Sequence, residues 1–153
     1  MLRISSYNCQ SANTGFPILK KLCEDSDIVL LQETFHNESN HGILGELHVD
    51  FDYAHVPAIR RLDVFTGRAS GGLAILWRKS KTIKYFPVYF NDRMQGLKIL
   101  SNDISYLLIN VYLNCDYRTI DSIIEYKSNL AHISNIINDE NYSELIVSGD
   151  LFT

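Results

Sequence analysis

The middle of this chain predicts several β-strands in succession, with no helix between them. Apolar and β-branched residues gather in short runs separated by polar or glycine-containing stretches, a pattern typical of strands. The expected strands of this block are Tyr53–Val56, Gly71–Trp77, Lys84–Phe90, Leu97–Leu100 and Tyr106–Leu113. Parallel strands of a doubly wound sheet need crossover helices between them, so this order indicates mixed sheets instead.

Helical patterns occur only before and after the strand block. Pro17 fits the first turn of a short amphipathic helix, whose apolar residues are Ile18, Leu19, Leu22 and Cys23. The second helix is expected over Ile120–Asn138, with Thr119 as its candidate N-cap. Its apolar residues recur at steps of three and four and predict one stripe facing the core: Ile123, Tyr126, Leu130, Ile133 and Ile137.

Three more strands complete the expected fold: Leu2–Cys9, Ile28–Gln32 and Leu145–Val147. The last two are continuous apolar runs, which are typical of strands covered on both faces. The stretch from His36 to Leu47 is polar and is expected to be loop or short helix. Two mixed sheets packed together and flanked by helices, an α/β architecture, fit this order of elements.

Length and composition are those of a globular domain. The chain has 153 residues, of which 46% are hydrophobic and 21% charged, so we expect a single domain. No apolar stretch is long enough to span a bilayer, and Met1–Ile4 runs into polar residues instead of a signal-peptide core. Cys9, Cys23 and Cys115 lie far apart, which indicates reduced thiols in an intracellular protein and no zinc site among the cysteines.

The charge is unevenly distributed. The net charge is −4, yet the segment from Arg60 to Lys84 holds seven bases and one acid, Asp63. A basic strip on an acidic body is suited to binding a phosphate backbone. The alternative is a solvated region of loops and sheet edges in which lysines discourage strand pairing. The sequence leaves both interpretations open.

Polar side chains stand where several apolar strands end. Glu33 follows the strand Ile28–Gln32, and Asp150 follows Leu145–Val147. Asn8, Tyr112 and Asn114 occupy comparable positions on other strands. A single acid at a strand end is more often an exposed residue than a ligand, but a shared placement favours a functional site. Carboxylate oxygens are ligands that hard ions such as magnesium (Mg2+) prefer.

Several short motifs occur in an order that resembles a known group of proteins. They are Ser6-Tyr7-Asn8, Leu31-Gln32-Glu33-Thr34, Gly67-Arg68-Ala69-Ser70-Gly71-Gly72-Leu73-Ala74, Asn110-Val111-Tyr112 and Ser148-Gly149-Asp150-Leu151. Over nearly its whole length the chain resembles the endonuclease/exonuclease/phosphatase superfamily. Within it, the likeness is greatest to the apurinic-type endonuclease domains of non-LTR (long interspersed) retrotransposons. The resemblance implies a four-layer α/β sandwich that hydrolyses phosphodiesters, most often by nicking DNA.

The resemblance also implies roles for individual residues. Glu33 would bind Mg2+, or Mn2+ in its place, and Asp150 would orient or deprotonate the attacking water. Asn8 would orient the metal shell and the phosphate, and Tyr112 would hydrogen-bond the phosphate. The basic strip and the glycine-rich motif suggest three nucleic-acid contacts: Arg68, Ser70 and Arg78. The histidines fall on none of the motifs and are interpreted as ordinary surface or core residues: His36, His41, His48, His55 and His132.

Three departures from the family pattern bear on the expected function. Phe152 stands where the family has Asn, and Asn114 stands where it usually has Pro. The family also continues with further strands and a Ser-Asp-His motif, which do not occur up to Thr153. We therefore expect residues 1–153 to be the N-terminal portion of the sandwich, truncated at the C-terminus.

Three functions remain open at this point. The first is an Mg2+-dependent phosphodiesterase, in family terms a DNA endonuclease, with DNA as partner and the nucleus as one candidate location. The second is a catalytically inactive remnant that binds nucleic acid or a protein partner. The third is a phosphatase or phospholipid diesterase, because the superfamily also contains these enzymes. The sequence leaves the oligomeric state undetermined.

Overall fold

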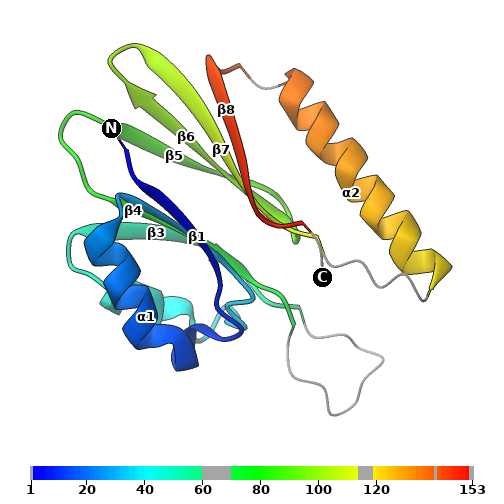
Figure 1. The fold of residues 1–153 in the computed structure, drawn as a ribbon, viewed down its shortest axis with the longest axis horizontal. Coiled ribbons are helices and arrows are strands. Elements are labelled where there is room, and N and C mark those ends of the chain that lie inside the picture. The colour runs from blue at the N-terminus through cyan, green and yellow to red at the C-terminus, as the bar shows by residue number, and fades with distance from the viewer. Residues whose placement is uncertain (1, 60–69, 114–118, 140, 152–153) are drawn as a thin grey trace.

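The computed structural model describes residues 2–59, 70–113, 119–139 and 141–151. These residues form four layers, with one helix on each outer side of two packed β-sheets (Figure 1). Each sheet has four strands, and each contains one parallel pair together with antiparallel pairs. The expected α/β fold with two mixed sheets is confirmed.

The first sheet has the strand order β1-β2-β4-β3. Its strands are β1 (Ile4–Asn8), β2 (Ile28–Gln32), β3 (Phe51–Val56) and β4 (Leu73–Arg78). The helix α1 (Ala12–Asp25) connects β1 to β2, which pair in parallel, whereas β4 pairs antiparallel with β2 and β3. The polar stretch after β2 contains a short 3-10 helix, η1 (His41–Glu46), as its composition suggested.

The second sheet has the strand order β5-β6-β7-β8. Its strands are β5 (Lys84–Asn91), β6 (Met94–Ser101), β7 (Ile104–Tyr112) and β8 (Glu144–Asp150). The helix α2 (Ile120–Asp139) connects β7 to β8, and these two strands pair in parallel. Both parallel pairs among the described strands therefore belong to strand–helix–strand units, as the geometry of parallel pairing requires.

The core is divided among the interfaces between layers. Leu30 of β2 packs toward the second sheet with Ile75 and Leu108, while its neighbour Leu31 packs toward α1. On the other side of the molecule, Ile109 of β7 packs beneath α2. Because strands such as β2 are covered on both faces, their sequences are apolar at successive positions without alternation.

Two details of the helices differ from expectation. The helix α1 begins at Ala12, so Pro17 lies inside it and not in its first turn. A proline there removes the hydrogen bond to the carbonyl of Asn13, yet Leu19 is buried against the sheet and the packed face keeps the helix intact. In α2, Leu130 is exposed while Ile136 is buried, so the contact face is rotated from the expected stripe.

Thr119 caps α2 as predicted. The backbone N–H of Ser122 donates to Thr119 Oγ1 at 3.2 Å, which satisfies one of the N-terminal N–H groups of the helix. We expect Thr119→Ala to lower the free energy of unfolding by about 1 kcal/mol, measured by urea denaturation. Thr119→Ser keeps the hydroxyl and is the matched control. Equal stability of the alanine variant and the wild type would contradict the capping role.

Two smaller expectations concern the cysteines and membranes. Cys9 and Cys23 are free and buried, and burial raises the pKa of each thiol to about 11. Cys115 lies outside the described residues. None of the described helices has the length and hydropathy that a membrane span requires.

Candidate active site

The carboxyl ends of the two parallel strand pairs lie together at one end of the sandwich. Asn8 ends β1 and Tyr112 ends β7, while Asp150 ends β8. Glu33 is the first residue after β2. In each pair the strands run in the same direction, so their last residues reach the same sheet edge: Asn8 is paired with Gln32, and Tyr112 with Asp150. Packing of the two sheets then brings the two edges together.

Asn8 connects the two carboxylates. Its amide Nδ2 donates one hydrogen bond to Glu33 Oε1 at 2.9 Å and another to Asp150 Oδ2 at 2.8 Å. The second bond joins residues that are 142 positions apart in the sequence. A neutral amide thus holds two acidic groups, one from each sheet, within reach of the same nitrogen. The structure brings together Asn8, Glu33 and Asp150, three of the residues that the sequence analysis names as site candidates.

A buried polar bridge beneath the site fixes the two sheets relative to each other. Gln32 Nε2 donates to Asn110 Oδ1 at 2.7 Å, and Asn110 Nδ2 donates to the carbonyls of Leu31 and Ala74 at 3.0 and 3.1 Å. Both side chains are almost completely buried, so these polar groups depend on each other for their hydrogen bonds. The neighbouring Glu33 is therefore held by a network that joins the two sheets.

Glu33 itself occupies an unusual backbone conformation. Its φ is 54°, in the left-handed region that costs energy for a residue with a Cβ. The following residue is held by a backbone hydrogen bond from Thr34 N to Gly72 O at 3.1 Å. Gly72 has a φ of 86°, and a Cβ at this position would lie 2.5 Å from Thr34 Oγ1. Glycine at position 72 thus permits the close contact that positions the strand end.

Tyr112 is buried beside the carboxylates. Burial raises the pKa of its hydroxyl to about 12, and the charge of Glu33, a hydrogen bond to Glu33 and the charge of Asp150 act in the same direction. Arg93 acts in the opposite direction, and its guanidinium lies 5.4 Å from the centre of the Tyr112 ring. The hydroxyl therefore stays protonated at neutral pH and can donate a hydrogen bond.

This environment makes stability depend on pH through Tyr112. Because the folded-state pKa lies near 12 and an exposed tyrosine titrates near ~10, the stabilisation is complete below about pH 10 and is lost toward pH 12. Two pKa units correspond to roughly 2–3 kcal/mol. When the pH is raised from about 10 to about 12, we expect the free energy of unfolding, measured by urea denaturation, to fall less in Tyr112→Phe than in the wild type. Equal losses would contradict the assignment.

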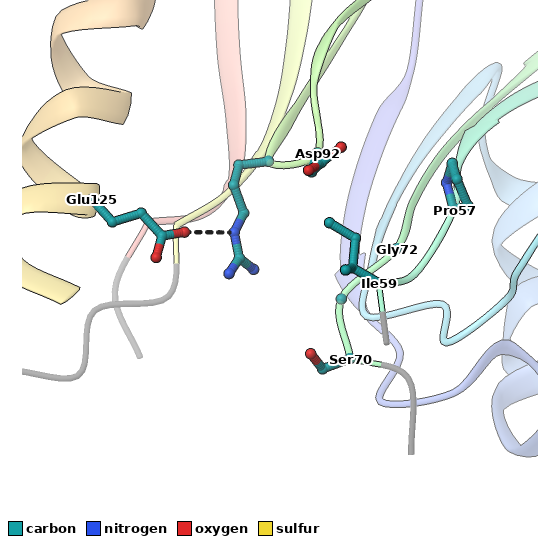
Figure 2. A pocket seen from close by; sticks show the side chains of 8 residues that line it. Pro57, Ile59, Ser70, Gly72, Asp92 and Glu125 are labelled. Atoms are coloured by element: carbon teal, nitrogen blue, oxygen red, sulfur yellow. Dashed lines mark hydrogen bonds and ion pairs between the residues drawn. The ribbon is translucent and has the colours of Figure 1, made fainter. Parts of the chain in front are cut away.

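A pocket of about 180 Å³ adjoins this cluster (Figure 2). Ser70 and Gly72, just before β4, line it together with Asp92 of the turn between β5 and β6 and Glu125 of α2. Arg93 also lines the pocket, and its Nε lies 3.3 Å from Glu125 Oε1, the contact drawn as a dashed line in Figure 2. Ser70, one of the nucleic-acid contacts suggested by the sequence, thus lines the pocket beside the site.

Arg93 is the residue that sequence reasoning missed. It lies in the turn between β5 and β6, outside every motif, and its backbone carbonyl accepts a hydrogen bond from Tyr112 N at 2.9 Å. Its side chain is 20% exposed and is the cation that the structure places against the Tyr112 ring. No local sequence signal identifies it, because its position depends on the pairing of β6 with β7.

Arg78, another expected nucleic-acid contact, is not brought to this edge. Leu73, the first residue of β4, pairs with Gln32 and so lies beside Glu33. Arg78 is the last residue of β4 and therefore lies at the opposite end of the strand, away from Glu33. Its guanidinium donates to the Cys23 carbonyl at 2.7 Å and stacks near the Phe51 ring. Arg68, with the basic residues Arg60 and Arg61, lies outside the described residues, as do Asn114 and Phe152.

The donor set at the site fits a hard divalent cation. Glu33 and Asp150 offer carboxylate oxygens, and Asn8 turns its amide nitrogen toward both of them. Two carboxylates drawn toward one neutral amide repel each other, and a bound cation would remove that repulsion. Magnesium requires oxygen ligands and keeps several waters, so a partly open protein shell is sufficient for it.

Solved structures share this fold. D. rerio TDP2, humanized by 14 mutations, is 16% identical with a TM-score of 0.70, covering 98% of this chain and 62% of that one. An AP endonuclease from Archaeoglobus fulgidus is 16% identical with a TM-score of 0.69, covering 99% of this chain and 57% of that one. The human Nocturnin catalytic domain with bound sulfate is 16% identical with a TM-score of 0.65, and the match covers 98% of this chain and 63% of that one.

This chain thus spans less than two thirds of the length of each of these three proteins. A search of curated protein sequences gave no significant match. A model of one protein family, described as the Endonuclease/Exonuclease/phosphatase family, matches residues 5–150, which include the whole cluster from Asn8 to Asp150. The chain therefore belongs to the Endonuclease/Exonuclease/phosphatase family.

Proposed function

We propose that this protein is a magnesium-dependent phosphodiesterase that nicks DNA, in the manner of the endonuclease domains of non-LTR retrotransposons. One observation carries the proposal. The Asn8 amide holds Glu33 of one sheet and Asp150 of the other at 2.9 and 2.8 Å, which gathers the two acids that phosphodiester hydrolysis needs. Family membership and the order of the motifs support the reaction class.

The proposed roles are those that the family resemblance implies, and the positions of the side chains support them. Glu33 would hold Mg2+, or Mn2+ in its place, and the ion would polarise the phosphate and stabilise charge on the leaving oxygen. Asp150 would accept a proton from the attacking water, and Asn8 keeps this carboxylate oriented. Tyr112 would donate its hydroxyl proton in a hydrogen bond to a phosphate oxygen, since its high pKa keeps that proton in place.

DNA is the preferred substrate on two grounds. Ser70 and Arg93 line a pocket beside Tyr112, where a hydroxyl and a guanidinium can contact backbone phosphates. Among proteins of the same fold, the Neisseria 3′ phosphatase NExo has been solved bound to a product DNA hairpin, and D. rerio TDP2 with a single-strand DNA product. Each of these proteins is at most 16% identical to this chain, so DNA is proposed as the substrate and is not assigned from them.

The test is conversion of supercoiled plasmid to the nicked form by the purified chain, with Mg2+, with Mn2+ and with EDTA. Metal-dependent nicking is expected. A parallel panel contains a phosphate monoester and a phospholipid diester. Cleavage of the phosphate monoester or the phospholipid diester, with no nicking of DNA, would contradict the proposal and indicate a phosphatase or a phospholipase-type diesterase. Salt-sensitive DNA binding without cleavage of any substrate would support a binding role without catalysis.

A further inference from the structure

A second group of metal-binding side chains lies outside the candidate active site. Glu38, His41 and His55 each offer one ligand atom, and these atoms all lie within 4.8 Å of one another. We call these three residues the Glu38 cluster. Glu38 lies in the turn before η1, His41 is the first residue of η1, and His55 lies on β3. The cluster thus joins the segment that follows Glu33 to an edge strand of the first sheet.

The two imidazoles are held close together. The ring centres of His41 and His55 are 3.8 Å apart and the rings are stacked at 17°. His55 Nε2 lies 3.8 Å from Glu38 Oε2, beyond the range of a hydrogen bond. His41 Nδ1 is hydrogen-bonded to the Tyr53 hydroxyl at 3.0 Å, which leaves Nε2 of the same ring for another ligand. Metal-bound histidines are commonly oriented by such a bond at the second nitrogen.

Buried nitrogen atoms without partners mark the same region. Among the described residues, three buried side-chain N or O atoms lack a hydrogen-bond partner, and two of them are His55 Nε2 and His36 Nδ1. The His36 ring is almost completely buried, and its other nitrogen is 3.1 Å from Asn13 Oδ1. Buried polar atoms are nearly always paired, so these two unpaired nitrogens require an explanation.

The surroundings of His55 and His36 favour the neutral form of each imidazole. Burial lowers the pKa of His55, and the nearby His41 lowers it further, while Glu38 acts in the opposite direction. Burial likewise lowers the pKa of His36, followed by the effects of His55 and His41. A neutral imidazole has the lone pair that coordinates a metal ion.

We propose that the Glu38 cluster binds a zinc-class divalent ion through two imidazole nitrogens and one carboxylate, with water completing the shell. Nitrogen-rich sites of this kind favour zinc, whereas the all-oxygen donor set of Glu33 and Asp150 favours magnesium. Binding would require the His55 ring to turn out of its stack on His41, while the Tyr53 hydroxyl keeps the His41 ring in place. The ion then ties the turn at Glu38 to β3 and fixes the segment that follows Glu33.

The proposal is tested on the full chain with the metal alone as probe. Zinc is titrated by calorimetry, and Co2+ serves as a spectroscopic substitute whose visible absorption reports tetrahedral geometry. We expect one ion per chain, and at least about tenfold weaker binding in each of Glu38→Gln, His41→Asn and His55→Asn. Tyr53→Phe, which removes the orienting hydroxyl, is expected to weaken binding about 10- to 100-fold.

Matched controls separate this site from other ligands of the chain. His48→Asn and His132→Asn remove histidines outside the cluster, and Glu33→Gln alters the candidate active site. All three should bind zinc as the wild type does. Absence of a thiolate-to-cobalt charge-transfer band would exclude the cysteines as ligands. The Glu38 side chain is 77% exposed, so Glu38→Gln is expected to fold normally and gives a variant free of folding defects.

Thermal unfolding supplies a second readout that does not depend on enzyme activity. At a zinc concentration of 100 times Kd, the midpoint of the wild type should rise by roughly 5–10 °C, and that of Glu38→Gln should not. The proposal is wrong if the wild type binds no zinc, or if the three cluster variants bind it as tightly as the wild type does. In that case the stacked histidines are a packing feature only.

Discussion

Replacement of Glu33 by Gln is expected to reduce Mg2+-dependent nicking of plasmid DNA by at least about 10²- to 10³-fold. In the wild type, Asn8 Nδ2 donates to Glu33 Oε1 at 2.9 Å. Glutamine has the same size and keeps one side-chain oxygen that can accept this hydrogen bond. It removes the negative charge that would hold the cation. The loss should therefore appear in the rate and in the magnesium concentration that gives half-maximal activity, with the fold unchanged by circular dichroism.

The same variant gives a second readout in the absence of metal. The charge of Glu33 and its hydrogen bond raise the pKa of Tyr112, so Glu33→Gln should lower that pKa from about 12 toward the ordinary value. The pKa is measured from tyrosinate absorbance as the pH is raised. Comparison with Tyr112→Phe identifies the part of the absorbance that comes from Tyr112. Glu24→Gln is the matched control, because Glu24 is exposed on α1 beside Lys21. Nicking by Glu33→Gln within about threefold of the wild type would refute its role as metal ligand.

Replacement of Gly149 by Ala is expected to cause the largest loss of stability, about 3–5 kcal/mol. Gly149 has a φ of 139°, and a Cβ there would lie 2.0 Å from Val111 O and 2.8 Å from Val111 N. Val111 is its partner across the parallel β7–β8 pair, so neither backbone can move without breaking the pairing. Urea denaturation measures the loss.

The control for this variant is Gly42→Ala, because a Cβ at Gly42 would meet nothing within 4 Å. Gly42 also lacks the positive φ of Gly149, so alanine at position 42 meets neither backbone strain nor a close contact. Gly149 also directly precedes Asp150, so the distorted strand should displace that carboxylate and reduce nicking as well. An alanine at position 149 that changes stability by less than about 1 kcal/mol would show that the β8 backbone can relax.

Local patterns accounted for the elements and for the main cluster. The apolar run at Ile28–Leu31 is buried at every position, and the expected strand ends at the observed residue. Because Asn8, Glu33 and Asp150 all stand at the ends of apolar strands and fall on motifs that resemble one family, they could be assigned to one site before any contact was known. The start of helix α1 was harder to predict, because Pro17 suggested a later start than Ala12 and packing overrode that local signal.

Contacts between distant segments could not be predicted in this way. Arg93 reaches the Tyr112 ring only because the turn between β5 and β6 lies beside the end of β7. Arg78 looked like a member of a basic strip, but antiparallel pairing places it at the far end of β4, among the carbonyls of Cys23 and Ser26. A charge count along the sequence does not report which sheet edge a residue reaches.

The sequence by itself determined the order of strands and helices, the mixed sheets and the acids at the strand ends. These depend on periodicity and burial, which neighbouring residues encode. The tertiary structure decided which side chains meet: Asn8 with Asp150 across 142 positions, and His41 with His55 on the outer face of the first sheet. Such contacts depend on how the two sheets and the connecting segments pack, and no local pattern specifies that packing.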